Sequence, residues 1–197
     1  MIKVIDYKAG NAPSVLNAVS HLGFKAEPAR GVQDIAGATH IILPGVGSAG
    51  ATMDSLREMG MLDALEKAVL GRKVSFLGIC VGMQILFGHS EEGDAKCLGW
   101  LAGRVVKFDA SKVRVPQMGW NQVRFMKDTP FDPGSGHFYF VNSYYAKPDD
   151  ESDLWGTADY DGAFAAAISK DNICATQFHV EKSGEAGLRL LSRFLSL

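Results

Sequence analysis

The feature that most constrains the fold is the alternation of short apolar runs with helical patterns in the first half of this 197-residue chain. Apolar runs typical of buried strands occupy residues 2–7, 24–28, 40–43 and 73–79. Helical spacing follows at residues 14–22, at residues 52–70 with a break expected near Gly60, and at residues 81–87. Because strands that alternate with helices form βαβ units, this half predicts a parallel sheet.

The second half is different, because short strands are predicted there without helices between them. They lie at residues 103–108, 122–126, 137–145, 154–158 and 163–168, and this pattern is typical of antiparallel hairpins. A last apolar strand at residues 173–178 precedes a helix that ends near Leu195 and for which Ser183 is the expected N-cap. We therefore expect one domain, residues 1–197. Its fold should be α/β with three layers (α/β/α), and its central sheet mainly parallel with added antiparallel strands.

Composition and charge exclude several classes of partner and location. The net charge of −2 gives no electrostatic reason to expect a nucleic acid or an anionic membrane as partner. The N-terminus does not resemble a signal peptide, and no window approaches 18 uninterrupted apolar residues. The three cysteines, Cys80, Cys97 and Cys174, are therefore expected to be free thiols in a reducing cytoplasm. No metal-ligand spacing such as CxxC or HExxH is present, so no metal is expected.

A candidate nucleophile lies where the run at residues 73–79 meets the helical pattern that follows it. Gly78, Cys80 and Gly82 form a G-x-C-x-G segment, which has the spacing of a nucleophile elbow. Such a turn projects the sulfur above the sheet and points the N–H groups of the following helix at it, which favours the reactive thiolate. Most free cysteines are simply small buried side chains, and Cys97 and Cys174, which lack this context, fit that description.

A candidate base follows the last predicted strand. His179 and Glu181 are two residues apart, so in extended backbone their side chains point to the same side. Glu181 can then accept a hydrogen bond from one imidazole nitrogen of His179, and the other nitrogen can face Cys80 in a Cys-His-Glu triad. An isolated histidine is more often structural or exposed, and His137, which precedes a predicted strand, is the reserve candidate for the base.

Glycines after the run at residues 40–43 suggest an oxyanion site. A backbone N–H of Val46 or Gly47 could meet a developing oxyanion opposite the backbone N–H of Val81. An ordinary strand-to-helix turn explains the same glycines equally well.

Together these motifs resemble the class I (triad) glutamine amidotransferases. The resemblance runs from about Lys3 to Phe194. Within the family, the chain is most similar to one branch, the glutaminase subunits of imidazole glycerol phosphate synthases. The segments that carry it are IDYKAGN, LPGVGSAG, GICVGMQILF, HSEEG, VPQMGWNQV, FYFVNSYYA and TQFHVEKSGEAGLRLL.

The resemblance implies an activity, a partner and a set of contacts. Such a subunit hydrolyses L-glutamine to L-glutamate and ammonia without a cofactor. It passes the ammonia to a (β/α)8-barrel cyclase subunit, which makes imidazole glycerol phosphate and an aminoimidazole carboxamide ribotide for histidine biosynthesis. The residues implied to contact glutamine are Gly47, Gln84, Glu92, Ser143 and Tyr144. Tyr139 and Lys182 are implied to lie at the mouth that faces the cyclase.

Four positions depart from the usual pattern of this branch. Val180 replaces proline, Asn142 and Gln117 each replace histidine, and Lys8 replaces glycine. The triad is intact, but the departures leave open a related amidotransferase subunit that serves a different synthase. A non-catalytic scaffold subunit and a stand-alone cysteine peptidase are further alternatives.

Overall fold

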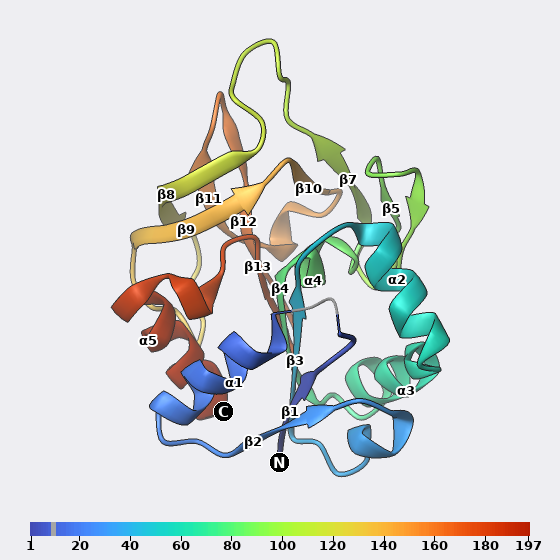
Figure 1. The fold of residues 1–197 in the computed structure, drawn as a ribbon. Coiled ribbons are helices and arrows are strands. Elements are labelled where there is room, and N and C mark those ends of the chain that lie inside the picture. Colours follow the sequence, from blue (N-terminus) through green and yellow to red (C-terminus); the bar gives the residue numbers. More distant parts are fainter. Residues whose placement is uncertain (9–10) are drawn as a thin grey trace.

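The computed structural model describes residues 1–8 and 11–197 and has a parallel half and an antiparallel half (Figure 1). Five strands in the spatial order β2-β1-β3-β4-β13 form the parallel half. Their bounds are β1 Ile2–Ile5, β2 Ala26–Ala29, β3 His40–Gly45, β4 Ser75–Cys80 and β13 Ile173–Thr176. Every residue of β1, β3 and β13 is buried, as expected of parallel strands that are covered on both faces.

Helices cover both faces of these strands. In Figure 1, α1 (Ala12–His21) and α5 (Gly184–Leu195) lie on one side, and α2 (Ala49–Glu58) and α3 (Met61–Glu66) lie on the other. The expected break near Gly60 is confirmed, because Gly60 separates α2 from α3 with a left-handed φ of 66°. A short π-helical turn, Lys67–Gly71, follows α3. The predicted three-layer α/β/α fold is confirmed.

The antiparallel half continues the same sheet from β13 through β12, β10 and β7. Strand β11 pairs with both β12 and β8, and β8 pairs with β9 to form a ribbon at the upper left of Figure 1. The bounds of the longer strands are β7 Gly103–Lys107, β8 Gln117–Phe125, β9 Gly136–Asn142, β10 Tyr144–Pro148, β11 Leu154–Asp159 and β12 Ala163–Lys170. Two-residue strands β5 (His89–Ser90) and β6 (Ala95–Lys96) complete the edge.

Many element ends lie a few residues from those expected, and three elements differ more clearly from the sequence-based expectations. The single strand expected at residues 137–145 is two strands separated by Ser143, because β9 pairs with β8 whereas β10 pairs with β7 and β12. The strand expected at residues 122–126 begins earlier, at Gln117, because β9 provides pairing partners for residues 117–123 of β8. The helix expected at residues 81–87 is α4, Val81–Gln84, a single turn.

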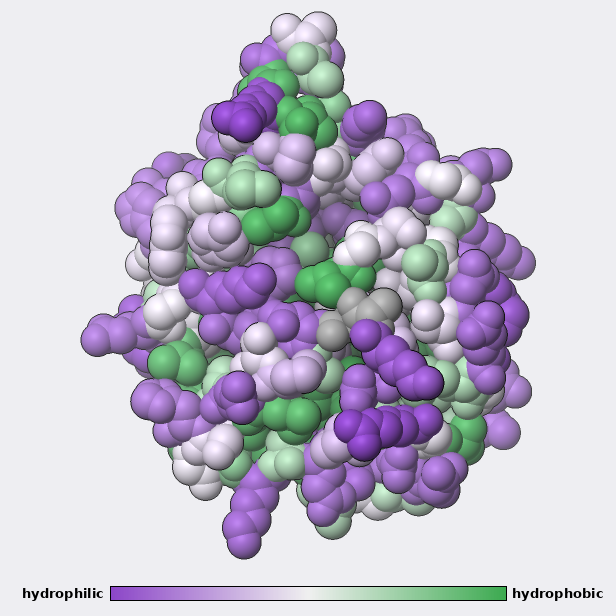
Figure 2. All heavy atoms as spheres, in the orientation of Figure 1, coloured by the Kyte–Doolittle hydropathy of each residue, from purple (hydrophilic) through white to green (hydrophobic). Residues whose placement is uncertain are grey.

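The surface is mainly polar, with apolar residues exposed in separate patches on the face that Figure 2 shows. Two large side chains of β8 are prominent among the exposed apolar residues: Met118 is 67% exposed and Trp120 is 57% exposed. None of the helices within residues 1–8 and 11–197 is both long and apolar enough to span a membrane.

Candidate active site

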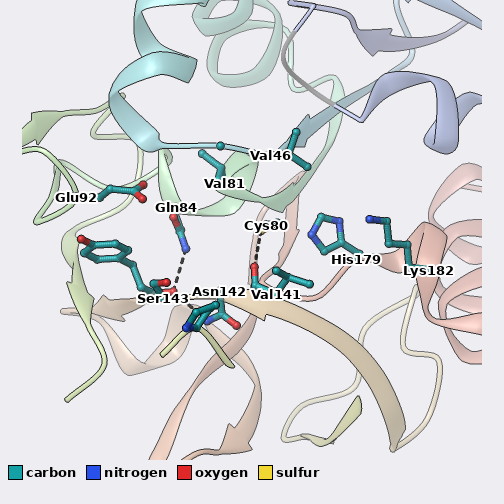
Figure 3. Close-up of a pocket in the computed structure, with 13 residues that line it drawn as sticks. Val46, Cys80, Val81, Gln84, Glu92, Val141, Asn142, Ser143, His179 and Lys182 are labelled. Carbon is teal, nitrogen blue, oxygen red and sulfur yellow. Dashed lines mark hydrogen bonds between the residues drawn. The ribbon is translucent and has the colours of Figure 1, made fainter. Parts of the chain in front are cut away.

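A cavity of about 300 Å³ lies where the carboxyl ends of β3 and β4 meet the antiparallel half (Figure 3). This is the edge of a parallel sheet at which ligands usually bind. Its lining includes all the residues expected at the oxyanion site and at the glutamine contacts, together with the candidate nucleophile and base. These lining residues are Val46, Gly47, Cys80, Val81, Gln84, Glu92, Ser143, Tyr144 and His179.

Close backbone packing forces the chain into a sharp turn at Cys80. This residue ends β4 and precedes α4 with φ 55° and ψ −111°, a conformation that residues other than glycine rarely adopt. A Cβ added to Gly78 would lie 2.6 Å from the Gly82 carbonyl oxygen, and a Cβ on Gly82 would overlap the Leu43 carbonyl oxygen of β3. The glycines therefore hold the elbow against the sheet, and the strained residue is the one that carries the thiol.

The sulfur of Cys80 has one hydrogen-bond acceptor and one donor close to it. The Val141 carbonyl oxygen lies 3.9 Å from Sγ, and Gln177 Nε2 lies 3.6 Å from it. The other two thiols are also buried, but burial raises the pKa of Cys97 to about 11 and holds the pKa of Cys174 well above its ordinary value. Among the three cysteines, only Cys80 lines the cavity.

His179 and Glu181 form a buried, hydrogen-bonded pair beside Cys80. His179 Nδ1 lies 2.8 Å from Glu181 Oε1, which also accepts a 2.8 Å hydrogen bond from Asn11 Nδ2. Burial alone would lower the pKa of His179, but its interactions with Cys80 and Glu181 outweigh burial and raise this pKa to about 10. Burial would raise the pKa of Glu181, yet the hydrogen bond and charge of His179 hold it below its ordinary value.

The backbone at His179 is fixed by neighbours in both halves of the molecule. The His179 N–H donates to the Tyr139 carbonyl at 3.0 Å, and the Ser183 hydroxyl donates to the His179 carbonyl at 2.6 Å. Ser183 does occupy the N-cap position of α5, but its side chain makes no capping hydrogen bond there, because the hydroxyl bridges His179 and the Tyr139 N–H instead. Val180 is buried and takes the first position of a short 3-10 turn, Val180–Lys182. At a first helical position a proline or a valine can be accommodated, since the N–H has no intrahelical partner.

Gln84 and Glu92 supply the polar side chains of the opposite wall. Gln84 Nε2 donates to the Tyr144 carbonyl at 3.0 Å and to Gln177 Oε1 at 2.9 Å, so its carbonyl oxygen is the part that remains free for a ligand. Glu92 accepts a 2.9 Å hydrogen bond from the Ala49 N–H at the start of α2, which leaves its second carboxylate oxygen for a cationic group. This wall can therefore accept hydrogen bonds and bind positive charge.

The remaining predicted residues lie at the margin of the cavity or outside it. Lys182 is exposed and lines the rim, and half-buried Tyr139 does not line the cavity but packs edge-to-face against Trp120 with 6.0 Å between ring centroids. His137, the reserve base, is exposed on β9 and also outside the lining. The structure therefore provides no role for His137 in this cavity.

Sequence reasoning missed Asn11 and Gln177. Gln177 lies in a predicted apolar strand, and its contact with Cys80 joins residues that are far apart in the sequence. Asn11 is 170 positions from Glu181, with which it forms a hydrogen bond. No local sequence pattern indicates either contact. Ala9 and Gly10, in the same IDYKAGN segment as Asn11, lie outside the described residues. In the part of the chain that the structure describes, no group of three or more His, Cys, Asp or Glu side chains is placed to hold a metal ion.

Known proteins resemble this chain in sequence and in fold. The model of the family "Glutamine amidotransferase class-I" matches residues 3–196. "Imidazole glycerol phosphate synthase subunit HisH" of Leptospira interrogans is 42% identical over the full length of both chains. "Imidazole glycerol phosphate synthase hisHF, chloroplastic" of Arabidopsis thaliana is 45% identical over 99% of this chain and 34% of its own.

Among solved structures, a glutamine amidotransferase superposes with a TM-score of 0.80 at 21% identity, covering 99% of this chain and 97% of that one, which supports the fold. The family match extends over nearly the whole chain and agrees with the cysteine elbow and the His-Glu pair described above. This chain therefore belongs to the class-I glutamine amidotransferase family.

Proposed function

We propose that this chain is the glutaminase subunit of an imidazole glycerol phosphate synthase and that it hydrolyses L-glutamine to L-glutamate and ammonia. The observation that carries the proposal is the meeting of a strained cysteine and a buried His-Glu pair at one cavity, in a chain 42% identical to a HisH subunit. In this proposal Cys80 is the nucleophile, His179 the general acid and base, and Glu181 the residue that orients His179.

The first half of the reaction forms a thioester. Cys80 transfers its proton to His179, and the thiolate attacks the side-chain amide carbon of glutamine. The C=O electron pair moves to oxygen, and the oxyanion accepts a hydrogen bond from the Val81 N–H. The intermediate then collapses, the C–N bond breaks, and His179 protonates the departing ammonia. Glu181, hydrogen-bonded to His179 Nδ1, supports the imidazolium that acts as the acid in this step.

The second half regenerates the enzyme. His179 removes a proton from water, the hydroxide attacks the glutamyl thioester, and the C–S bond breaks to release glutamate and the Cys80 thiol.

The second oxyanion donor requires a rearrangement of residues 44–47. In this proposal the segment turns so that the N–H of Val46 or Gly47 points at the oxyanion. Gly47, with φ 95°, provides the backbone freedom for this change.

The cavity wall fits glutamine. The α-ammonium group of the substrate would bind Glu92, and the free carbonyl oxygen of Gln84 would accept a substrate N–H. Gly47, Ser143 and Tyr144 complete the set of proposed contacts, and all of them line the cavity.

The proposed partner is a (β/α)8-barrel cyclase subunit that receives the ammonia. Two features support it. The Arabidopsis relative carries the name of the synthase on a chain of which this protein covers only 34%. In addition, Met118 and Trp120 are exposed on β8 beside Tyr139, and apolar side chains exposed together are typical of a protein interface.

The test is glutamate production from glutamine, measured with and without the cyclase subunit and its nucleotide ligand. We expect strong stimulation by the liganded cyclase and loss of activity in Cys80→Ala. Cys97→Ala is the matched control, because it removes a buried thiol outside the cavity and should retain turnover. Glutamine turnover that ignores the cyclase would redirect the proposal to a different synthase, and no turnover under any condition would favour a scaffold role.

A further inference from the structure

A chain of two buried amides leads from the cavity wall to the sulfur of Cys80. Gln177 is fully buried, and Gln84 is 3% exposed. Gln84 Nε2 donates to Gln177 Oε1 at 2.9 Å, and Gln177 Nε2 donates to Cys80 Sγ at 3.6 Å. A second hydrogen bond from Gln84 Nε2, to the Tyr144 carbonyl at 3.0 Å, holds the start of the chain.

These contacts define which way each amide faces. Gln84 meets two oxygen acceptors, so the atom that bonds to them must be its NH₂ group. Gln177 receives one of these hydrogen bonds on its oxygen, and its own NH₂ group therefore points to the sulfur. The direction of the chain is thus determined by a backbone carbonyl, which cannot reverse its role.

Besides its interaction with His179, the sulfur lies near the Val141 carbonyl and the Gln177 amide, and these two groups favour different protonation states. The Val141 carbonyl, at 3.9 Å, can only accept, so it interacts favourably with the thiol and unfavourably with a thiolate. The Gln177 NH₂ group can donate to a thiolate, and it lies closer, at 3.6 Å. A donor that has no exposure to water acts in a medium of low dielectric, where a hydrogen bond to an anion is strong.

We propose that Gln177 is a positioning residue that donates a hydrogen bond to the Cys80 sulfur and stabilises its thiolate, and that Gln84 orients Gln177. This inference rests on the proposed function for the use of the thiolate, but it concerns the ionisation of Cys80 itself. A purely space-filling Gln177 would contribute to stability and leave this ionisation unchanged.

The test is the rate of Cys80 alkylation by iodoacetamide between pH 5 and 10, which requires no glutamine and no partner. Cys80→Ala supplies the background from the two buried thiols. Gln177→Met keeps the size of the side chain but removes the donor, and we expect the alkylation midpoint to rise by about 1 pH unit, since one charge-assisted hydrogen bond has roughly that effect. Gln84→Met leaves Gln177 in place but unoriented, and we expect a smaller shift in the same direction.

Outcomes separate this proposal from the proposed function. Folded Gln177→Met and Gln84→Met proteins with the wild-type midpoint would overturn it. If Gln177→Met does not fold, Gln84→Met decides the question alone. If the midpoint shifts while the wild-type protein fails to hydrolyse glutamine with any partner, the role of Gln177 stands and the proposed function fails.

Discussion

The parallel and antiparallel halves of the sheet contribute to the cavity in different ways. The parallel half and the segments that follow its strands supply the functional side chains of Cys80, Gln84 and His179. The antiparallel half supplies backbone carbonyls: that of Val141 to Cys80 Sγ, that of Tyr144 to Gln84 Nε2 and that of Tyr139 to the His179 N–H.

This difference indicates where sequence change is tolerated. A contact made by a side chain is lost when that residue changes, whereas a contact made by a backbone carbonyl survives substitution as long as the strand keeps its register. Two of the four departures from the usual family pattern, Gln117 and Asn142, lie opposite each other on β8 and β9. Both substitutions change side chains in the antiparallel half, whose backbone carbonyls hold Cys80, Gln84 and His179 in place.

The largest expected effect comes from a reactive side chain next to the parallel half. Glu181→Gln keeps the shape of the side chain but removes the charge that supports the His179 imidazolium. We expect glutamine turnover to fall by roughly 10²- to 10⁴-fold with the fold unchanged. The pKa of His179, measured by NMR titration, should also fall below about 10, because one of the interactions that raise it is gone. Unchanged turnover would leave Glu181 with a structural role only.

The next effect tests the packing of the elbow. Gly82→Ala places a methyl group against the Leu43 carbonyl, and we expect it to lower the free energy of unfolding by about 3 kcal/mol in urea titrations. Gly50→Ala in α2 is the matched control, because its methyl group would lie 3.7 Å from the nearest atom. We expect the control to change stability by less than about 1 kcal/mol. Equal losses in the two variants would contradict the close approach described for the elbow.

An exposed side chain of the antiparallel half should contribute to binding of the cyclase subunit and not to the basal rate of glutamine hydrolysis. We expect Trp120→Ala to weaken cyclase binding by about 10- to 100-fold, as for an aromatic residue at an interface hot spot. Its basal glutaminase activity should match that of the wild type. Met126→Ala is the control, since Met126 is comparably exposed, at 54%, and lies just beyond the far end of β8. A loss of basal activity in Trp120→Ala would contradict the assignment of this part of the antiparallel half to partner binding alone.

The smallest expected effect concerns Asn11, which forgoes capping α1 and donates to Glu181 instead. Asn11→Ala removes one hydrogen bond to a charged group, and we expect about a tenfold loss of kcat with little change in stability. Asn121→Ala, which removes a 2.8 Å amide hydrogen bond to the Asp159 carbonyl in the antiparallel half, should leave kcat unchanged. If the two variants behave alike, Asn11 has no specific effect on the triad.

The same division between the halves explains how far the sequence alone could be interpreted. Strands β1, β3 and β4 were predictable because they are short, apolar and separated by helices. The elbow at Cys80 and the spacing of His179 and Glu181 are local patterns, and the structure places these residues together. The break at Ser143 was not predictable, because it depends on the pairing of β10 with β7 and β12, neither of which is its neighbour in the chain. The contacts of Asn11 and Gln177 were missed for the same reason, since their partners lie far away in the chain.

The change of partners at Ser143 has a mechanical consequence. The chain leaves the outer ribbon at Asn142 and joins the central sheet at Tyr144, whose carbonyl holds Gln84. Ser143 alone therefore links β9, which pairs with the strand that carries Trp120, to Tyr144, whose carbonyl holds Gln84. With only Ser143 between them, we expect a displacement of the ribbon at Asn142 to move the Tyr144 carbonyl and, with it, the cavity wall at Gln84.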